Sequence, residues 1–201
     1  MPVEVKGMVE LRKSLRKFVP DLAKESNKEL AAALKPLTNK ARGFLPANDD
    51  VPSGWLKREG AQGRWANRFY DQTIARRGVV YSTAPTKANK KGFRSVATIY
   101  NKSAAGAIYE TAGRKTQGQQ GNSANPMAGQ KFIEELNKSG TLANADYAKR
   151  VGRHSKKLVG RVIFKAYAQD QGKTTAAVMK ALEKVTQNAA DYVNRAGFKN
   201  G

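Results

Sequence analysis

Apolar residues that recur at three- and four-residue steps constrain the fold of this chain more than any other feature of its sequence. The first series is Met8, Leu11, Leu15, Phe18 and Val19; the second, which includes a serine, is Leu22, Ser26, Leu30, Leu34, Leu37 and Ala41. This spacing is typical of an amphipathic helix. Because proline lacks an N–H and crowds the preceding turn, Pro20 should interrupt or restart the helix and Pro36 should kink or break it. Residues 8–45 are therefore predicted to form a long, bent helical arm.

A second helical pattern lies near the C-terminal end, over residues 174–196. Thr174 or Thr175 can cap this helix, and Gly197 is expected to end it. Its predicted apolar face consists of Val178, Leu182, Val185, Ala189, Tyr192 and Val193.

Two strands are predicted in the middle of the chain, at residues 78–84 and 93–100. Both segments are rich in β-branched and aromatic residues. The connection between them, 86–92, is predicted to be an exposed basic hairpin loop. It contains Lys87, Lys90 and Lys91.

The predicted strands are flanked by shorter elements. Residues 46–54 are dense in turn formers and predict a loop, whereas residues 55–77 fit no single class. Ser103 can cap a short helix over 104–110 that finishes at Gly113. The small residues of that helix would let it pack closely against another backbone.

The region beyond this helix is less regular. Residues 114–130 are polar and glycine-rich, so we expect a mobile loop or one that orders on assembly. Phe132, Ile133 and Leu136 indicate another short helix, and residues 158–167 indicate a strand or an extended segment.

The order of helices, then strands, then a terminal helix favours an α+β fold over repeated βαβ units. We expect a single domain over residues 1–201, with a long N-terminal helical arm and a C-terminal helix packed on a small antiparallel sheet. Residues 114–160 are interpreted as an insertion within it. No apolar run approaches the roughly 20 residues of a membrane helix, and the first residues lack the apolar core of a secretory signal.

The charge of the chain is strongly positive, with 37 Lys and Arg residues against 16 Asp and Glu, a net +21. Residues 46–173 carry 23 basic and 9 acidic side chains, so they supply +14 of this excess. Such a charge makes a compact monomer repel itself and attracts polyanions. The sequence therefore predicts a nucleic acid or an acidic protein as a neighbour.

The chemistry available to the chain is narrow, because it has no cysteine and one histidine, His154. Disulfides, thiolate zinc sites and thiol nucleophiles are excluded, as is a His-rich metal centre. A catalytic histidine needs an orienting partner, and no acidic residue lies near His154 in sequence. We expect neither a catalytic site nor a metal or cofactor, and no enzymatic function.

Three further patterns have structural explanations that we favour. The carboxylates of Glu134 and Glu135 would diverge on a helix, and Asp49 with Asp50 suits a turn. The Gly-Lys-Thr triplet at 172–174 lacks the earlier glycine of a phosphate-binding loop, since Tyr167 stands there, so helix capping explains it better.

Basic and aromatic residues alternate over residues 64–70, as they do in single-strand binders. Buried aromatics with solvated arginines on the far side produce the same string, and we favour that interpretation. The residues with possible contacts to DNA or to an acidic partner are Arg64, Arg68, Arg76, Arg77, Lys87, Lys90, Lys91, Arg150, Arg153, Lys156 and Lys157.

Several segments, taken in order, resemble the neck and tail-completion proteins of long-tailed bacteriophages. Val5-Lys6-Gly7-Met8-Val9-Glu10-Leu11 is similar to the family's opening, which precedes a long helix. Ala41-Arg42-Gly43-Phe44-Leu45-Pro46 and Ser53-Gly54-Trp55-Leu56 resemble the turn that follows that helix. Ala107-Ile108-Tyr109-Glu110-Thr111-Ala112-Gly113 resembles a later segment, and 174–196 the closing helix.

The resemblance implies a structural virion protein that forms a ring of six or twelve subunits at the head–tail junction. The implied neighbours are connector or stopper proteins, tail-terminator or tail-tube proteins, and the double-stranded DNA of the channel, with no membrane. The implied locations are the virion and, during assembly, the host cytoplasm. The alternative hypothesis is a free-standing nucleic-acid-binding protein that acts mainly through phosphate contacts.

Overall fold

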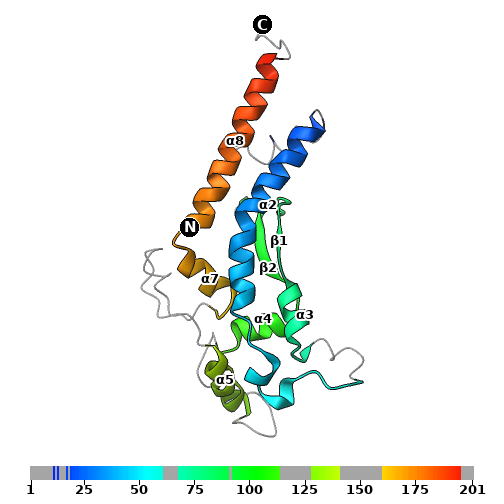
Figure 1. The fold of residues 1–201 in the computed structure, drawn as a ribbon, viewed down its shortest axis with the longest axis vertical. Coiled ribbons are helices and arrows are strands. Elements are labelled where there is room, and N and C mark those ends of the chain that lie inside the picture. The colour runs from blue at the N-terminus through cyan, green and yellow to red at the C-terminus, as the bar shows by residue number, and fades with distance from the viewer. Residues whose placement is uncertain are drawn as a thin grey trace. The chain divides into compact units, whose positions relative to one another are not determined.

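The structure is a computed structural model that describes residues 11, 13, 17, 19–60, 68–90, 92–113, 128–140 and 160–195. Its fold is α+β, with helices toward both ends and a small antiparallel sheet of two strands, as the sequence predicts (Figure 1). The elements are α2 (Pro20–Gly43), the 3-10 helices η1 (Asn48–Asp50) and η2 (Ser53–Trp55), α3 (Gln72–Gly78), β1 (Val79–Ser82), β2 (Thr98–Asn101), α4 (Ala104–Thr111), α5 (Ala128–Ser139), α7 (Ile163–Asp170) and α8 (Lys173–Arg195).

The chain divides into two compact units, each assembled from segments that are distant in sequence. The first unit draws on Met1–Pro36, Tyr81–Ile99 and Gly172–Gly201, and the second on Leu37–Val80 and Tyr100–Gln171. The predicted 114–160 insertion falls within the second unit, where residues 128–140 and 160 are described. The opening Val3-Glu4-Val5, whose alternation could form a short strand, lies outside the described residues.

The two prolines of the N-terminal arm affect the helix in different ways. α2 begins at Pro20, where the fixed φ of proline suits the first turn of a helix. Of the kink or break predicted at Pro36, the break was wrong, because α2 runs through it, and the kink stays a prediction. Pro36 and Ala32 are both exposed, so water can reach the carbonyl of Ala32 that proline leaves without its usual donor.

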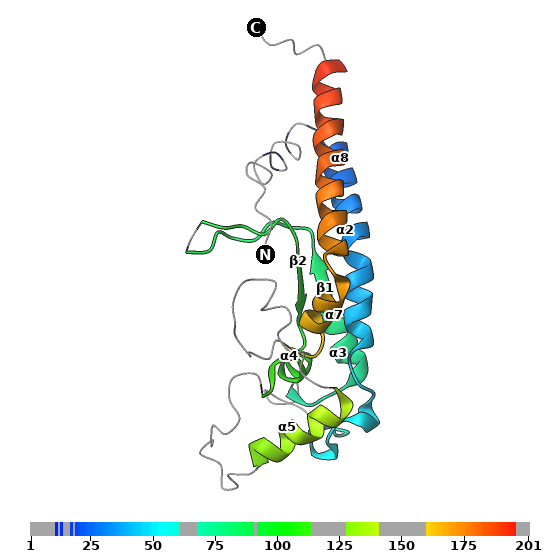
Figure 2. The same ribbon diagram turned by 90° about the vertical axis from the view of Figure 1, so that its left-hand side faces the viewer.

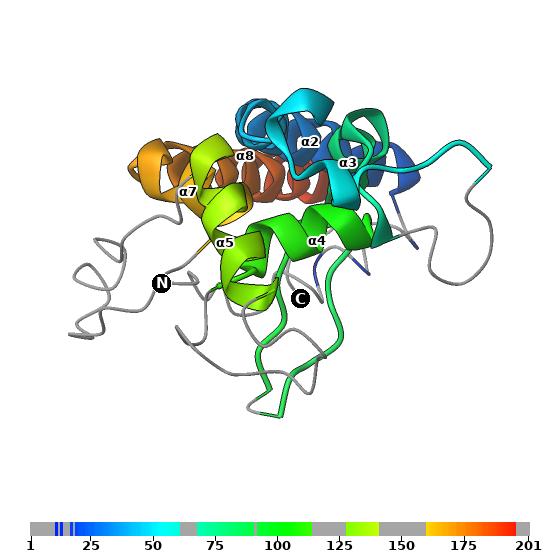
Figure 3. The same ribbon diagram turned by 90° about the horizontal axis from the view of Figure 1, so that it is seen from below.

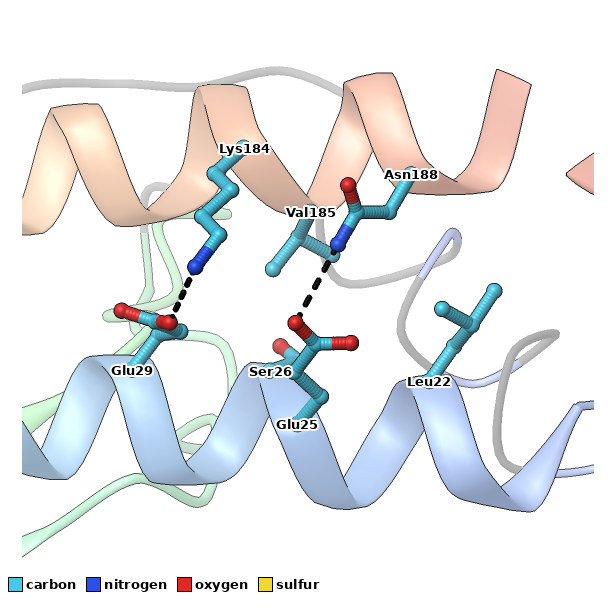
Figure 4. Close-up of a pocket in the computed structure, with 7 residues that line it drawn as sticks. All are labelled: Leu22, Glu25, Ser26, Glu29, Lys184, Val185 and Asn188. Atoms are coloured by element: carbon cyan, nitrogen blue, oxygen red, sulfur yellow. Dashed lines mark hydrogen bonds and ion pairs between the residues drawn. The ribbon is translucent and has the colours of Figure 1, made fainter. Parts of the chain in front are cut away.

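In the first unit, α8 lies antiparallel to the first part of α2, with two polar contacts one helical turn apart (Figure 4). Lys184 Nζ donates to Glu29 Oε1 at 2.5 Å, and Asn188 Nδ2 donates to Glu25 Oε1 at 3.3 Å. Apolar side chains flank these contacts in two small clusters. One is built on Leu30, Ala181 and Leu182, and the other on Ala23 and Val185.

The helix α8 differs from the prediction in its N-terminal cap and in one residue of its predicted apolar face. The helix starts at Lys173, and Thr174 is buried within the first turn, so neither Thr174 nor Thr175 is its cap. Leu182 and Val185 are buried as predicted, but Tyr192 is 46% exposed. Gly197 lies outside the described residues, as does the side chain of Val193.

The strands β1 and β2 are shorter than predicted, because the hairpin loses its regular pairing beyond Ser82. Isolated hydrogen bonds continue it, including one from Thr86 N to Ser95 O at 3.0 Å. Lys87 and Lys90 are exposed, which confirms the exposed basic loop. Figure 2 shows this part of the hairpin extending away from α2 and α8.

In the second unit, α3 packs against α4 (Figure 3), and Gly78 at the end of α3 allows a close approach to the start of α4. A Cβ at Gly78 would lie 2.6 Å from Asn101 Oδ1 and 2.9 Å from Ser103 N, and a Cβ at Gly106 would overlap the Asn101 amide. Ser103 caps α4, its Oγ accepting from Gly106 N at 3.1 Å. The predicted cap is thereby confirmed, while the close approach at Gly106 is to the side chain of Asn101 in β2 and not to another backbone.

Two predictions for the later chain need correction. Residues 158–167 were expected to be extended, but α7 begins at Ile163, for a reason that lies in α4 and is given below. Residues 128–130, assigned to the mobile loop, are helical, and the helix predicted around Leu136 is α5. The remainder of that loop, 114–127, lies outside the described residues.

Ser26 offers a test of the helix pair. Its side chain is buried on the α2 face toward α8, and its Oγ has no hydrogen-bond partner within the described chain. Replacing a buried, unsatisfied hydroxyl by hydrogen removes a desolvation cost. We expect Ser26→Ala to raise the free energy of unfolding by about 1 kcal/mol, measured by urea denaturation followed by circular dichroism.

The matched control is Ser53→Ala, which removes an exposed hydroxyl. It should change the free energy of unfolding by less than about 0.5 kcal/mol. A clear loss of stability in Ser26→Ala would show that the hydroxyl is satisfied in solution.

Candidate functional site

The second unit is centred on Tyr70, which is 1% exposed and joins three separate segments. Its hydroxyl donates to the carbonyl of Pro46 at 2.8 Å. Its ring lies 5.1 Å from that of Trp55 and 6.4 Å from that of Tyr109. Burial raises the pKa of the Tyr70 phenol well above its ordinary value, so the group acts as a neutral donor.

Trp55 extends this aromatic group to α5. Its Nε1 donates to the carbonyl of Arg68 at 2.7 Å, and the ring of Phe132 meets its ring edge-on at 5.2 Å. Aromatic pairs in this arrangement contribute beyond the area that they bury. The rings therefore hold the segment after α2, the segment before α3, and α5 together.

Next to these rings, Glu110 of α4 fixes the start of α7. Its carboxylate accepts hydrogen bonds from the backbone N–H groups of Val162 and Phe164, the latter at 3.0 Å. These first backbone donors of a helix have no partner within the helix itself. Gly160 is required beside them, because a Cβ there would lie 2.5 Å from Glu110 Oε1. This long-range cap explains why residues 163–170 are helical.

Arg161 is the most completely enclosed cation among the described residues, at 1% exposure. Its Nε donates to Gly140 O at 2.8 Å, and its Nη1 donates to Tyr109 O at 2.9 Å and to Ala112 O at 2.8 Å. Its Nη2 donates to Asn137 Oδ1 at 2.7 Å. The guanidinium also lies 5.6 Å from the centre of the Tyr109 ring. One side chain thus ties the end of α4 to the end of α5.

Burial dominates the electrostatics of this buried pair, Glu110 and Arg161. It raises the pKa of Glu110, against the opposing effect of the backbone donors. It lowers the pKa of Arg161, against the opposing effect of the Glu110 carboxylate. A buried carboxyl with a raised pKa is a common mark of an active site. Here both oxygens are already bonded to backbone N–H groups and the residue is 6% exposed, so we interpret the pair as structural.

The predicted contact residues are divided between the two units. Arg68, Arg76 and Arg77 are exposed in the second unit, while Lys87 and Lys90 are exposed in the first. The other six, Arg64, Lys91, Arg150, Arg153, Lys156 and Lys157, lie outside the described residues. Tyr70 is a core residue beside the exposed Arg68, which agrees with the packing interpretation of the basic–aromatic string.

The remaining candidate groups take up structural roles where they are described. Asp50 accepts from the backbone of Ala47 at 3.2 Å, which confirms the turn assigned to Asp49 and Asp50. Glu134 and Glu135 are exposed on α5, and Glu135 pairs with Lys138 at 2.5 Å. His154 lies outside the described residues.

Two further kinds of site can be judged over the described part of the chain. No group of three or more His, Asp or Glu side chains is placed there to hold a metal ion. No helix in the same ranges is long and apolar enough to cross a bilayer. Comparison with protein-family models, with curated proteins and with solved structures found no match.

Sequence reasoning missed Arg161 as a central residue and saw Glu110 only as part of a family-like segment. The signal at Arg161 was weak, since it follows a strongly basic stretch that suggests a solvated surface. The glycine that precedes Arg161 was the one available signal, because a glycine can mark a place where the backbone closely approaches another group.

Arg161→Lys tests the guanidinium contacts. Lysine keeps the charge, but its single ammonium cannot reach acceptors on both α4 and α5. We expect the free energy of unfolding to fall by about 3 kcal/mol, measured by urea denaturation. The control Arg76→Lys changes an exposed arginine and should cost less than about 0.5 kcal/mol. Equal, small effects would contradict the role assigned to Arg161.

Glu110→Gln tests the buried carboxyl through pH. Because the folded-state pKa of Glu110 is raised, its contribution to stability is complete below the ordinary value of 4.5 and is lost as pH rises through the folded-state pKa. Glutamine does not titrate but loses one backbone acceptor, so the variant should be less stable overall. Its deficit relative to the parent should shrink as pH rises above 4.5.

Urea titrations across this pH range provide the measurement, with Glu59→Gln, which removes an exposed carboxyl, as the control. The control should stay within about 0.5 kcal/mol of the parent. A deficit that grows with pH would mean that the ionised form of Glu110 is the better stabilised one.

Proposed function

We propose that this chain is a structural virion protein that forms a ring in the head–tail junction of a long-tailed bacteriophage. The observation that carries the proposal concerns three segments that resemble the neck and tail-completion family, at residues 41–46, 53–56 and 107–113. All three contact Tyr70, through Pro46, Trp55 and Tyr109 respectively. The three family-like segments, which follow one another in the order that the family has, thus pack into one interior. This is what we expect if the chain shares the fold of that family.

The chemistry of that interior supports a framework role. Pro46, Trp55 and Tyr109 contribute a carbonyl and two rings to packing, and Glu110 contributes its carboxylate to the start of α7. These groups hold helices in place, and the Pro46 carbonyl and the Glu110 carboxylate accept hydrogen bonds from other parts of the protein. We therefore propose a non-enzymatic subunit with a rigid interior.

The charge supports an assembly in which the chain has polyanionic neighbours. A net +21 on 201 residues makes isolated subunits repel one another, and a ring would concentrate this charge further. DNA in the channel would offset that repulsion. We propose a ring of six or twelve subunits between the connector or stopper proteins and the tail-terminator or tail-tube proteins, assembled in the host cytoplasm.

The proposal is tested by removing the coding sequence of this chain from the phage genome that carries it. We expect DNA-filled heads and complete tails to accumulate separately, as counted by electron microscopy of lysates. Supplying the chain from a plasmid should restore joined particles.

The control is the same plasmid with a stop codon early in the coding sequence, which should restore nothing. Native mass measurement of the purified chain with its head-side neighbour provides a second readout, and a discrete ring is expected. Normally joined virions without the chain would overturn the proposal, and a free monomer that binds DNA would favour the alternative hypothesis.

A further inference from the structure

The hairpin arm, defined as residues 83–97 of the first unit, carries charge of one sign only. Its sequence contains four basic residues, Lys87, Lys90, Lys91 and Arg94, and no acidic one. Figure 2 shows the arm extending away from α2 and α8. Val96, at its base, packs against the apolar cluster of Leu30 and Leu182, so the arm has a fixed root.

Hydrogen bonds shape the arm as far as its tip. Thr86 binds Ser95 twice, through Thr86 N to Ser95 O at 3.0 Å and Ser95 N to Thr86 Oγ1 at 2.9 Å. Asn89 binds Phe93 twice, through Asn89 N to Phe93 O at 2.9 Å and Phe93 N to Asn89 Oδ1 at 3.0 Å. The two limbs therefore form a narrow ribbon, about 5 Å between backbones.

The cations of the arm are available to a partner. Lys87, Lys90 and Arg94 are exposed, and none of them forms an ion pair within the described part of the chain. Phe93, between them at the tip, is 45% exposed. The arm thus presents positive charge around one apolar ring, without acidic side chains that would repel phosphate.

We propose that the hairpin arm inserts into a groove of double-stranded DNA and contacts phosphates through Lys87, Lys90 and Arg94. The major groove is about 12 Å wide and admits a two-stranded ribbon. Lysine is depleted in protein–protein interfaces, which makes an acidic protein the poorer fit. The contacts reach the backbone, so binding is independent of DNA sequence. This inference rests on the proposed function, which brings DNA into the ring.

The test uses the full chain and a fluorescent 20-base-pair duplex, with affinity measured by anisotropy at several salt concentrations. The variant is the triple substitution Lys87→Gln, Lys90→Gln and Arg94→Gln. We expect its affinity at 0.1 M salt to fall by about 100-fold, and the slope of log affinity against log salt to fall by about three, one for each lost phosphate contact.

The matched control removes three exposed lysines from the helices of the same unit, through Lys35→Gln, Lys173→Gln and Lys180→Gln. Its total charge equals that of the arm variant, but its arm is intact, so it should keep most of the affinity. Unchanged circular dichroism in both variants shows that folding is intact. Equal losses in the two variants would overturn the proposal, because net charge and not the arm would then control binding.

Two competitor ligands distinguish the alternatives. A single strand of the same length that binds the arm as tightly as the duplex would overturn groove insertion, and polyglutamate that does so would indicate an acidic protein instead. If the purified chain fails to bind duplex DNA while its deletion still separates heads from tails, the arm proposal fails and the joining role stands. If the arm binds duplex DNA but deletion leaves virions joined, the proposed function fails instead.

Discussion

The second unit depends on one constraint, the need to satisfy two charges that it buries. Arg161 finds acceptors at the ends of α4 and α5, and Glu110 finds donors at the start of α7. A buried charge without partners is costly, so neither residue can be enclosed until these helix ends are in place. The pair therefore couples three short helices, each of which would be marginal in isolation, into one cooperative structure.

Arginines and lysines have different tasks in this chain. Arg161 uses the fork of its guanidinium to join backbone carbonyls from distant segments, and Arg42 donates twice to the one carbonyl of Val79. Lys87 and Lys90 are exposed. The planar guanidinium is suited to several fixed acceptors, whereas the ammonium is a compact, hydrated point charge. The large positive charge consequently includes cations that belong to the interior.

The sequence predicted those elements whose cause is local. Periodicity predicted α2 and α8, and the Ser103 cap predicted α4, because the signal lies within a few residues of each element. The start of α7 could not be predicted in this way, since its cap is a carboxylate 52 residues earlier in the chain. The same holds for the centre of the second unit: Tyr70 and Glu110 were visible as residue types, but which carbonyls and rings they would meet is fixed only by the tertiary fold.

The pairing of α2 with α8 has a consequence for how firmly the two helices are aligned. Glu25 and Glu29 are one turn apart, and so are Lys184 and Asn188. Sliding α8 by one turn would bring Lys184 from one carboxylate to the other, so the polar contacts alone would accept either alignment. The alignment is set by the small apolar clusters, where Leu182 and Val185 fit beside Leu30 and Ala23. The register of the helix pair is therefore selected by its apolar side chains, and the two polar contacts add stability without selecting it.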